Sequence, residues 1–136
     1  MTESELNEFL DAPRVAVLAT SDASGRSRQA PIWYLWEDGA AYLFTSRASL
    51  KWRNLLRDPR ASLCVDDRDP PYSSVVLDGS VEESDRPLYD LVLRLALAYY
   101  GEEHGRPFAE GYRDNPGVVI FKLTPDRVVS NKSTSY

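Results

Sequence analysis

The sequence predicts a small antiparallel β-barrel with peripheral helices, and three observations lead to this fold class. The chain of 136 residues suits one domain with its own hydrophobic core. Most of it divides into short β-favouring runs separated by turn residues. Helical patterns occur at only three places, whereas a parallel α/β sheet needs a crossover helix between successive strands.

The N-terminal third predicts one helix followed by strands. Thr2 and Glu5 have the spacing of a capping box, and apolar residues follow at helical intervals. Three β-favouring runs come next: "RVAVLAT" (14–20), "SRQAPIWYLWE" (27–37) and "AAYLFTS" (40–46). Pro31 indicates an edge strand or a bulge in the second run, because proline has no backbone N–H to donate. The pair Asp38-Gly39 predicts a tight hairpin between the second and third runs.

A short helix, "LKWRNLLRD" (50–58), is expected next, capped by Ser46 or Ser49. Its buried stripe is predicted to consist of Trp52, Leu55 and Leu56. Four further strands follow from β-favouring runs: "RASLCVD" (60–66), "SSVVLDGSVEE" (73–83), "GVVIFKLT" (117–124) and "RVVSN" (127–131). Gly79 marks a predicted bulge in the second of them.

A third helix is predicted from Pro87 to Tyr100, with Gly101 ending it. It carries two nearly opposite apolar faces: Leu88, Leu91, Val92, Leu95 and Tyr99 on one, and Leu93, Leu97 and Tyr100 on the other. A partner subunit could cover one of them, so we expect a homodimer. Residues 1–131 are expected to form a single domain, and residues 132–136 a flexible tail.

Charge and hydropathy argue against several classes of partner. The net charge of -5 and the pI of about 4.9 disfavour nonspecific binding to nucleic acid or anionic membranes. The start "MTESELNEFL" lacks the basic and apolar regions of a signal peptide, and the longest apolar run, 91–100, is too short to span a bilayer. We therefore expect a cytoplasmic protein with no nucleic-acid or membrane partner.

Cysteine and histidine chemistry is also disfavoured. The single cysteine, Cys64, excludes an intramolecular disulfide and is expected to be buried and inert in its strand. The single histidine, His104, lies forty residues away in a polar stretch that reads as an exposed loop. We therefore expect no metal site and no nucleophilic triad, and the sequence identifies no catalytic residue. No glycine-rich dinucleotide or Walker motif is present.

Residues 44–63, "FTSRASLKWRNLLRDPRASL", suggest an anion site. A strand end followed by a capped helix presents unpaired backbone N–H groups and the positive end of the helix dipole. Thr45, Ser46 and Ser49 add hydroxyl groups, and Lys51 and Arg53 add positive charge. These groups suit a phosphate. The alternative is a helix face that is merely solvated.

The same stretch resembles the flavin-binding segment of the pyridoxamine-phosphate-oxidase-like split-barrel family. That segment has an aromatic-Thr strand end, Ser-x-Lys, a short helix, Asn/Asp-Pro and an apolar strand. The matching residues are Phe44-Thr45, Ser49-Leu50-Lys51, Asp58-Pro59 and "RASLCV". The resemblance covers residues 14–83 well and continues more weakly through "GVVIFKLTPDRVVS". Within the family, "LKWRNLLRDPRASL" and "YYGEEHG" are most similar to the actinobacterial branch that uses the deazaflavin coenzyme F420.

The resemblance implies a six-stranded antiparallel split barrel, like that of FMN-binding proteins, with a cofactor at a homodimer interface. Thr45, Ser49 and Lys51 would bind the cofactor phosphate, with Ser46 and Arg53 beside it. The resemblance implies that the strand around Ala30, Pro31, Ile32 and Trp33 lines the cofactor ring. Tyr72 and Ser74 would approach the cofactor from the strand before Gly79, and they could come from the other subunit. For Trp33, packing in the core is an equal alternative to stacking on the cofactor.

The implied activity is that of an oxidoreductase: F420-dependent hydride transfer to a planar, electron-poor small molecule such as an enone, a quinone or a tetrapyrrole. Many FMN-using relatives carry arginine where Leu50 stands, so pyridoxamine-phosphate oxidation itself is not implied. Two alternatives keep the fold: an FMN-dependent oxidase or reductase, and a noncatalytic cofactor-binding protein. A third is a purely structural dimer.

Overall fold

The structure is a computed structural model that describes residues 1–133. Three helices accompany the sheet: α1 (Glu3–Asp11), α2 (Leu50–Arg57) and α3 (Leu88–Glu110). The strands are β1 (Ala16–Ser21), β2 (Ser27–Ile32), β3 (Leu35–Glu37), β4 (Ala40–Ser46), β5 (Arg60–Asp67), β6 (Ser73–Ser84) and β7 (Val118–Lys132). Within the described residues they form one antiparallel sheet of seven strands, one more than the six expected. Most of the predicted tail, 134–136, lies outside these residues.

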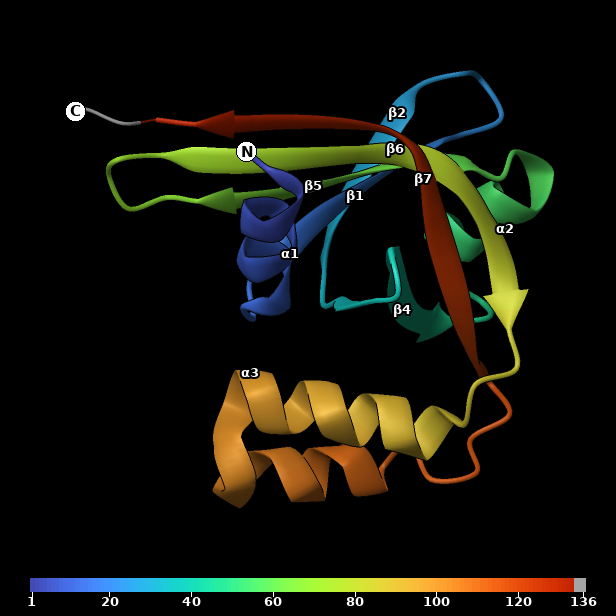
Figure 1. Ribbon diagram of the computed structural model, residues 1–136. Helices are drawn as coiled ribbons and strands as arrows, with labels where there is room; N and C mark the ends of the chain where they lie inside the picture. The colour runs from blue at the N-terminus through green and yellow to red at the C-terminus, as the bar shows by residue number, and fades with distance from the viewer. Residues whose placement is uncertain (134–136) are drawn as a thin grey trace.

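The sheet curls into a split barrel because its two edge strands are neighbours in sequence. The strand order is β2-β1-β5-β6-β7-β4-β3, so β2 and β3 lie at opposite edges. Only Trp33 and Tyr34 separate them along the chain. A link of this length brings the two edges together, and Figure 1 shows the resulting curled sheet. The predicted antiparallel barrel is confirmed.

The run predicted as one strand over residues 27–37 is therefore two strands. The chain leaves one sheet edge at Ile32 and enters the other at Leu35. The two residues between them point to different sides of the sheet. Tyr34 is buried inside the barrel, where its hydroxyl donates to the carbonyl of Leu10 at 3.0 Å. Trp33 packs outside the barrel against α3. Pro31 lies on an edge strand, one of the two predicted options, and pairs with Val17 without a bulge.

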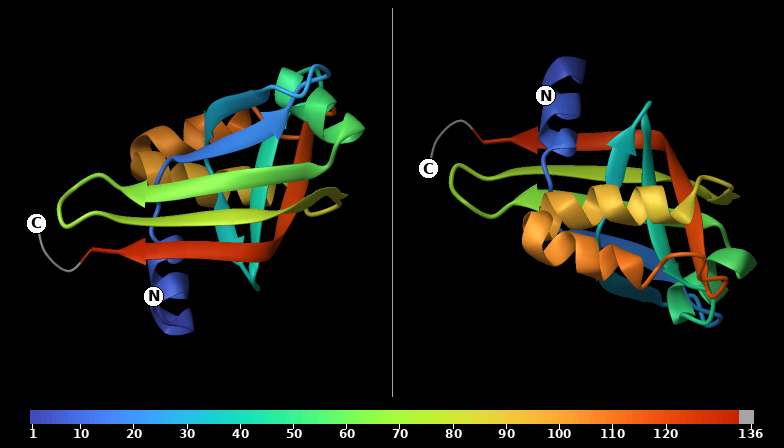
Figure 2. Two further views of the ribbon diagram at one scale, coloured as in Figure 1. Left: turned by 90° about the horizontal axis from the view of Figure 1, so that it is seen from above. Right: turned by 90° about the horizontal axis from the view of Figure 1, so that it is seen from below.

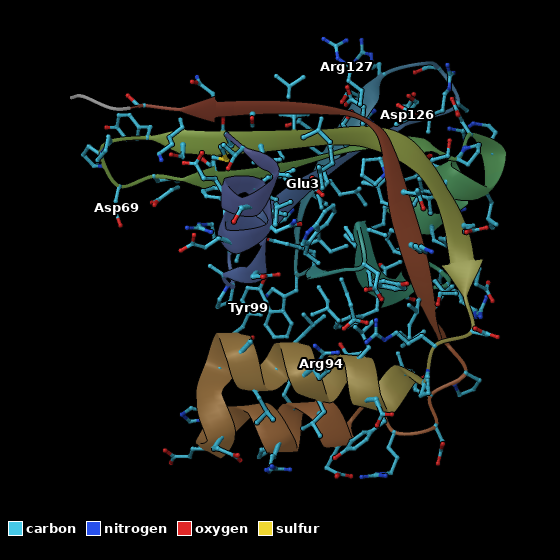
Figure 3. The ribbon with its side chains drawn as sticks, in the orientation of Figure 1. Glu3, Asp69, Arg94, Tyr99, Asp126 and Arg127 are labelled. Carbon is cyan, nitrogen blue, oxygen red and sulfur yellow. The ribbon has the colours of Figure 1, made fainter. Side chains whose placement is uncertain are left out.

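β7 is a single long strand where the sequence predicted two. The register with β6 shifts between Asp78 and Gly79, and Asp126 in β7 is the extra residue. The bulge predicted at Gly79 thus has its additional residue on the partner strand. A Cβ at Gly79 would lie 2.1 Å from the carbonyl oxygen of Thr124, so only glycine permits this approach. Figure 3 shows Asp126 and Arg127 at the bend of β7.

Two local predictions about the N-terminal third are confirmed. Thr2 and Glu5 form the reciprocal capping box of α1. Asp38 and Gly39, with φ values of 52° and 74°, form the tight hairpin between β3 and β4.

The main hydrophobic core fills the barrel. Its fully buried side chains come from five strands and include Leu18, Leu43, Leu63, Leu77 and Phe121. Leu10 of α1 closes one end of the barrel, and Trp52 and Leu55 of α2 pack against the same core. The third residue of the predicted α2 stripe, Leu56, is instead 70% exposed.

α3 is a helical hairpin. Gly101, with φ 79° and ψ 178°, breaks the helix where the sequence predicted its end. We call residues 88–100 the first limb and residues 102–110 the second limb. The second limb folds back antiparallel beside the first, and the pair lies on one side of the barrel (Figures 1 and 2). No helix in the part of the chain described here is long and apolar enough to cross a membrane.

The second limb covers part of the apolar surface of the first limb. Val92 and Ala96 of the first limb are buried together with Ala109 of the second. Leu93 packs in the same cluster. Tyr100 of the second predicted face is nevertheless 49% exposed, so the second limb covers that face only in part, and the expected homodimer stays a prediction.

Candidate functional site

A cleft of about 830 Å³ lies where the barrel meets the second limb. It is bordered by the ends of β2 and β4, the first turn of α2, the second limb and the start of β7. Its lining residues are Val15, Pro31, Ile32, Trp33, Phe44, Thr45, Ser46, Lys51, Phe108, Gly111, Tyr112, Asn115, Gly117 and Val118. This volume lies in the range of small-molecule and cofactor sites.

One part of the cleft is a cluster of hydroxyl and ammonium groups at the start of α2. Ser49 is the N-cap of the helix, and its hydroxyl accepts from the N–H of Trp52 at 3.2 Å. The Thr45 hydroxyl lies 3.2 Å from Ser49 Oγ, and Lys51 Nζ donates to Thr45 Oγ1 at 3.3 Å. We call Thr45, Ser49 and Lys51 the cradle. Ser46 lines the cleft beside it.

The electrostatics of the cleft favour an anion. Lys51 is the only charged side chain among the described residues that line it. The nearby Arg47 forms a bidentate ion pair with Glu83, at 3.0 and 3.2 Å, and does not line the cleft. No carboxylate among the described lining residues neutralises Lys51, so its ammonium and the helix dipole act together on a bound anion.

The other part of the cleft is aromatic. Trp33 stacks on Tyr99 of the first limb, with ring centroids 4.8 Å apart and planes 6° from parallel. Figure 3 shows Tyr99 reaching from the hairpin toward the barrel. The ring centroids of Phe108 and Trp33 are 5.3 Å apart, and those of Tyr112 and Phe44 are also 5.3 Å apart. One face of Trp33 is thus occupied by a ring of its own chain, which favours the packing interpretation of this tryptophan.

Six of the eleven predicted site residues line the cleft: Pro31, Ile32, Trp33, Thr45, Ser46 and Lys51. Ser49 is bonded to Thr45 directly behind them. Ala30 borders a neighbouring cavity of about 460 Å³ that Lys51 also lines. Arg53 is exposed and lines neither cavity.

Tyr72 and Ser74 lie elsewhere in the chain. They line a separate cavity with Arg68 and Asn131, at the turn between β5 and β6. Figure 3 labels Asp69 at this turn, at the far end of the molecule from α2. Within one chain they do not reach the cleft.

Sequence reasoning missed the aromatic residues that the second limb and the turn after it bring to the cleft. Phe108 lies near the end of the second limb, and Tyr112 lies in the turn that follows it. The sequence predicted that the helix would end at Gly101, and no site residue was assigned to the stretch after it. His104 is exposed as expected, although it lies in this helix rather than in a loop.

The cysteine does not take part in the site. Cys64 lies on β5 and is half-buried, and burial raises the pKa of its thiol. Among residues 1–133, no three His, Cys, Asp or Glu side chains come together as a metal site.

Comparison with known proteins gives structural neighbours over nearly the whole chain. A conserved hypothetical protein, Rv2991 from Mycobacterium tuberculosis, has a TM-score of 0.84 and 26% identity, with 98% of this chain and 86% of that chain covered. An F420 reductase has a TM-score of 0.75 and 23% identity, with 90% and 94% covered. The heme storage protein HutZ from Vibrio cholerae has a TM-score of 0.73 and 19% identity, with 98% of each chain covered.

None of the curated proteins compared with the chain matches it significantly. The family model described as "Pyridoxamine 5'-phosphate oxidase" matches residues 2–132. That match spans nearly every residue of the barrel, the cradle and the helical hairpin. The chain therefore belongs to the pyridoxamine 5'-phosphate oxidase family.

Proposed function

We propose that the protein is an oxidoreductase that binds coenzyme F420 in the cleft and transfers a hydride between it and a planar, electron-poor small molecule. The observation that carries the proposal is the cradle. In it, Lys51 Nζ lies 3.3 Å from Thr45 Oγ1 beside the capped start of α2. Family membership and the fold shared with an F420 reductase support the choice of cofactor.

The residues present fit a phosphorylated flavin-type cofactor. The cradle offers an ammonium and hydroxyl groups to a phosphate, and its donors are already held in place by bonds to one another. Pro31 and Ile32 lie on an edge strand, where alternate backbone groups have no strand partner and can bond a polar ring edge. When bound, such a cofactor supplies the hydride chemistry, and the protein binds and orients the reactants.

We further propose that the protein works as a homodimer through the outer face of its sheet. The register places Val17, Cys64, Val76 and Val129 in one row across β1, β5, β6 and β7. These residues alternate with the buried Leu18, Leu63 and Leu77, so the row faces away from the barrel core. An apolar row of this kind suits a second copy. In such a dimer, Tyr72 and Ser74 would belong to the partner's site.

Parallel equilibrium titrations with F420 and with FMN test the cofactor. We expect a lower dissociation constant for F420. Tighter binding of FMN would establish the FMN-dependent alternative, and binding without turnover of any quinone or enone would establish a noncatalytic carrier. Absence of binding to both would overturn the proposal.

Lys51→Ala tests the cradle. The substitution removes one charge-assisted hydrogen bond to the phosphate, so affinity for the cofactor should fall about ten- to a hundredfold. The melting temperature without cofactor should barely change, because a lysine near the positive end of a helix dipole contributes little to folding. Arg53→Ala is the matched control, since Arg53 lies on the same helix but does not line the cleft. Equal affinity of Lys51→Ala and the parent would contradict the cradle.

A further inference from the structure

We infer that the end of the second limb of α3 and the turn after it form the specificity element of the cleft, in which Phe108 and Tyr112 select acceptors with a flat, conjugated ring system. This inference rests on the proposed function, because it assigns the side of the cleft against which the second reactant lies. We call the rings of Phe108 and Tyr112 the wall. Phe108 and Tyr112 both line the cleft. Neither belongs to the cradle or to the barrel.

The two rings form part of a continuous aromatic surface. Phe108 and Tyr112 are 5.3 Å apart with planes at 37°, and Phe108 is tilted by 50° against Trp33. Tyr112 meets Phe44 edge-on, at 76°. Both rings are only half-buried, so each keeps area exposed toward the cleft. A flat ring in the cleft can meet these rings in the tilted and edge-on geometries that aromatic side chains favour.

The wall is held rigidly in place. A Cβ at Gly105 would lie 2.7 Å from the carbonyl oxygen of Ala96, so the limbs approach as closely as backbones allow. The Tyr89 hydroxyl of the first limb donates a hydrogen bond to the Glu110 carboxylate at 2.9 Å. The same carboxylate forms a bidentate ion pair with Arg113. Arg113 in turn lies over the Tyr89 ring, 3.7 Å from its centroid. Rings held in this way lose little conformational entropy when a ligand binds. They therefore discriminate between acceptors by the shape of the acceptor.

The chemistry of the wall defines the acceptor. Its rings carry no charge, and the only charged group in the described lining is Lys51, which the proposed cofactor phosphate occupies. The acceptor is therefore an uncharged ring system rather than a sugar or a carboxylate. Figure 2 shows the second limb running toward the end of the molecule that carries α2, so wall and cradle border one cleft.

The experiment compares Phe108→Leu and Tyr112→Leu with the parent, using menadione as a two-ring acceptor and cyclohex-2-enone as a small one. Leucine keeps an apolar side chain in the hairpin and removes only the ring. With reduced F420 as the hydride donor, kcat/KM for menadione should fall roughly two- to tenfold for each ring removed. The value for cyclohex-2-enone and the F420 dissociation constant should stay within about twofold.

Two control variants identify the ring as the cause. Tyr112→Phe keeps the ring without its hydroxyl and should behave like the parent. Tyr100→Leu removes a ring that touches Trp33 at 4.9 Å and Phe108 at 5.3 Å but does not line the cleft, and it should also behave like the parent. Unchanged menadione kinetics in both leucine variants, or a loss in Tyr112→Phe equal to that in Tyr112→Leu, would overturn the inference.

A binding measurement separates this inference from the proposed function. Titration calorimetry of menadione into cofactor-free protein should show weaker binding to both leucine variants than to the parent. That result would support the wall even if neither F420 nor FMN bound. Equal menadione binding by all variants, with F420 turnover intact in the parent, would reject the wall and leave the proposed function standing.

Discussion

Asn54 shows how one buried polar side chain sets the position of the cradle. It is 1% exposed, and its Nδ2 donates to Thr20 Oγ1 of β1 at 3.2 Å. Its Oδ1 accepts from Arg57 at 3.3 Å, and Arg57 also donates to the carbonyl of Ser21. These bonds fasten α2 to β1 one turn after Lys51, so they fix the direction of the helix start. The hydrophobic pattern predicted Leu56 as the third buried residue of α2, whereas the structure buries Asn54 instead. The sequence alone does not reveal that the Asn54 amide has hydrogen-bond partners inside the protein.

Asn54→Ala should lower the free energy of unfolding by about 1–3 kcal/mol, because it leaves the Thr20 hydroxyl buried without its partner. Urea denaturation measures this change. The double variant Asn54→Ala/Thr20→Val should lose less than the sum of the two single variants, because each single change already breaks the same bond. Additive losses would show that the Asn54–Thr20 bond contributes nothing to stability.

At the scale of elements, the helical hairpin is tied to the barrel by a carboxylate between two guanidinium groups. Glu37 of β3 pairs with Arg86 at 3.1 Å and with Arg94 of the first limb at 2.9 Å. The hydrogen bond from Arg94, followed by that from Arg86, lowers the pKa of Glu37 below its ordinary value. Arg86 also lies over the Tyr42 ring, 4.7 Å from its centroid. The hairpin, and with it the aromatic wall, is thereby positioned against the β3 edge.

Glu37→Gln should lower the melting temperature at neutral pH by a few degrees, since partly exposed ion pairs contribute about 1 kcal/mol or less. Because folding lowers the pKa of Glu37, its contribution is present above the unfolded value, near 4.3, and is lost as pH falls through the folded value. The difference between parent and variant should therefore shrink as the pH falls below about 4. Melting curves from neutral to acid pH measure it, and a pH-independent difference would exclude the charge as its cause.

At the scale of the whole molecule, predictions from local cap and turn signals held, and those that needed distant partners did not. The Thr2 capping box, the Asp38-Gly39 turn and the helix break at Gly101 were predicted because each is encoded within a few residues. The division of residues 27–37 follows from sheet closure, which brings the two sheet edges together and is not encoded locally. The single bent β7 similarly depends on its pairing with Gly79.

The same distinction applies to the site. Thr45, Ser49 and Lys51 were predicted together because one strand-to-helix turn carries all three. Phe108 and Tyr112 join them from about sixty residues away, because the second limb folds onto the first and carries the following turn to the cleft. Contiguous parts of a site can be predicted from one sequence, whereas parts that meet through tertiary packing need the structure.

Assembly is the last property of the whole molecule to test, and Val76 is the residue to change. It lies in the outward-facing apolar row between Cys64 and Val129. In a monomer, lysine at this position would extend into water at little cost, whereas in the proposed dimer it would bury an unpaired ammonium, which costs several kcal/mol.

Val76→Lys should therefore weaken the dimer by at least about a hundredfold, and sedimentation velocity at low micromolar concentration should show a folded monomer. Ala23→Lys, which adds the same charge in the exposed turn between β1 and β2, should remain dimeric. If Tyr72 and Ser74 act in the partner's site, the Val76→Lys monomer should also bind the cofactor more weakly with its own cradle intact. A parent protein that sediments as a monomer would contradict the assembly, and a monomeric variant with parental affinity would place the whole binding site within one chain.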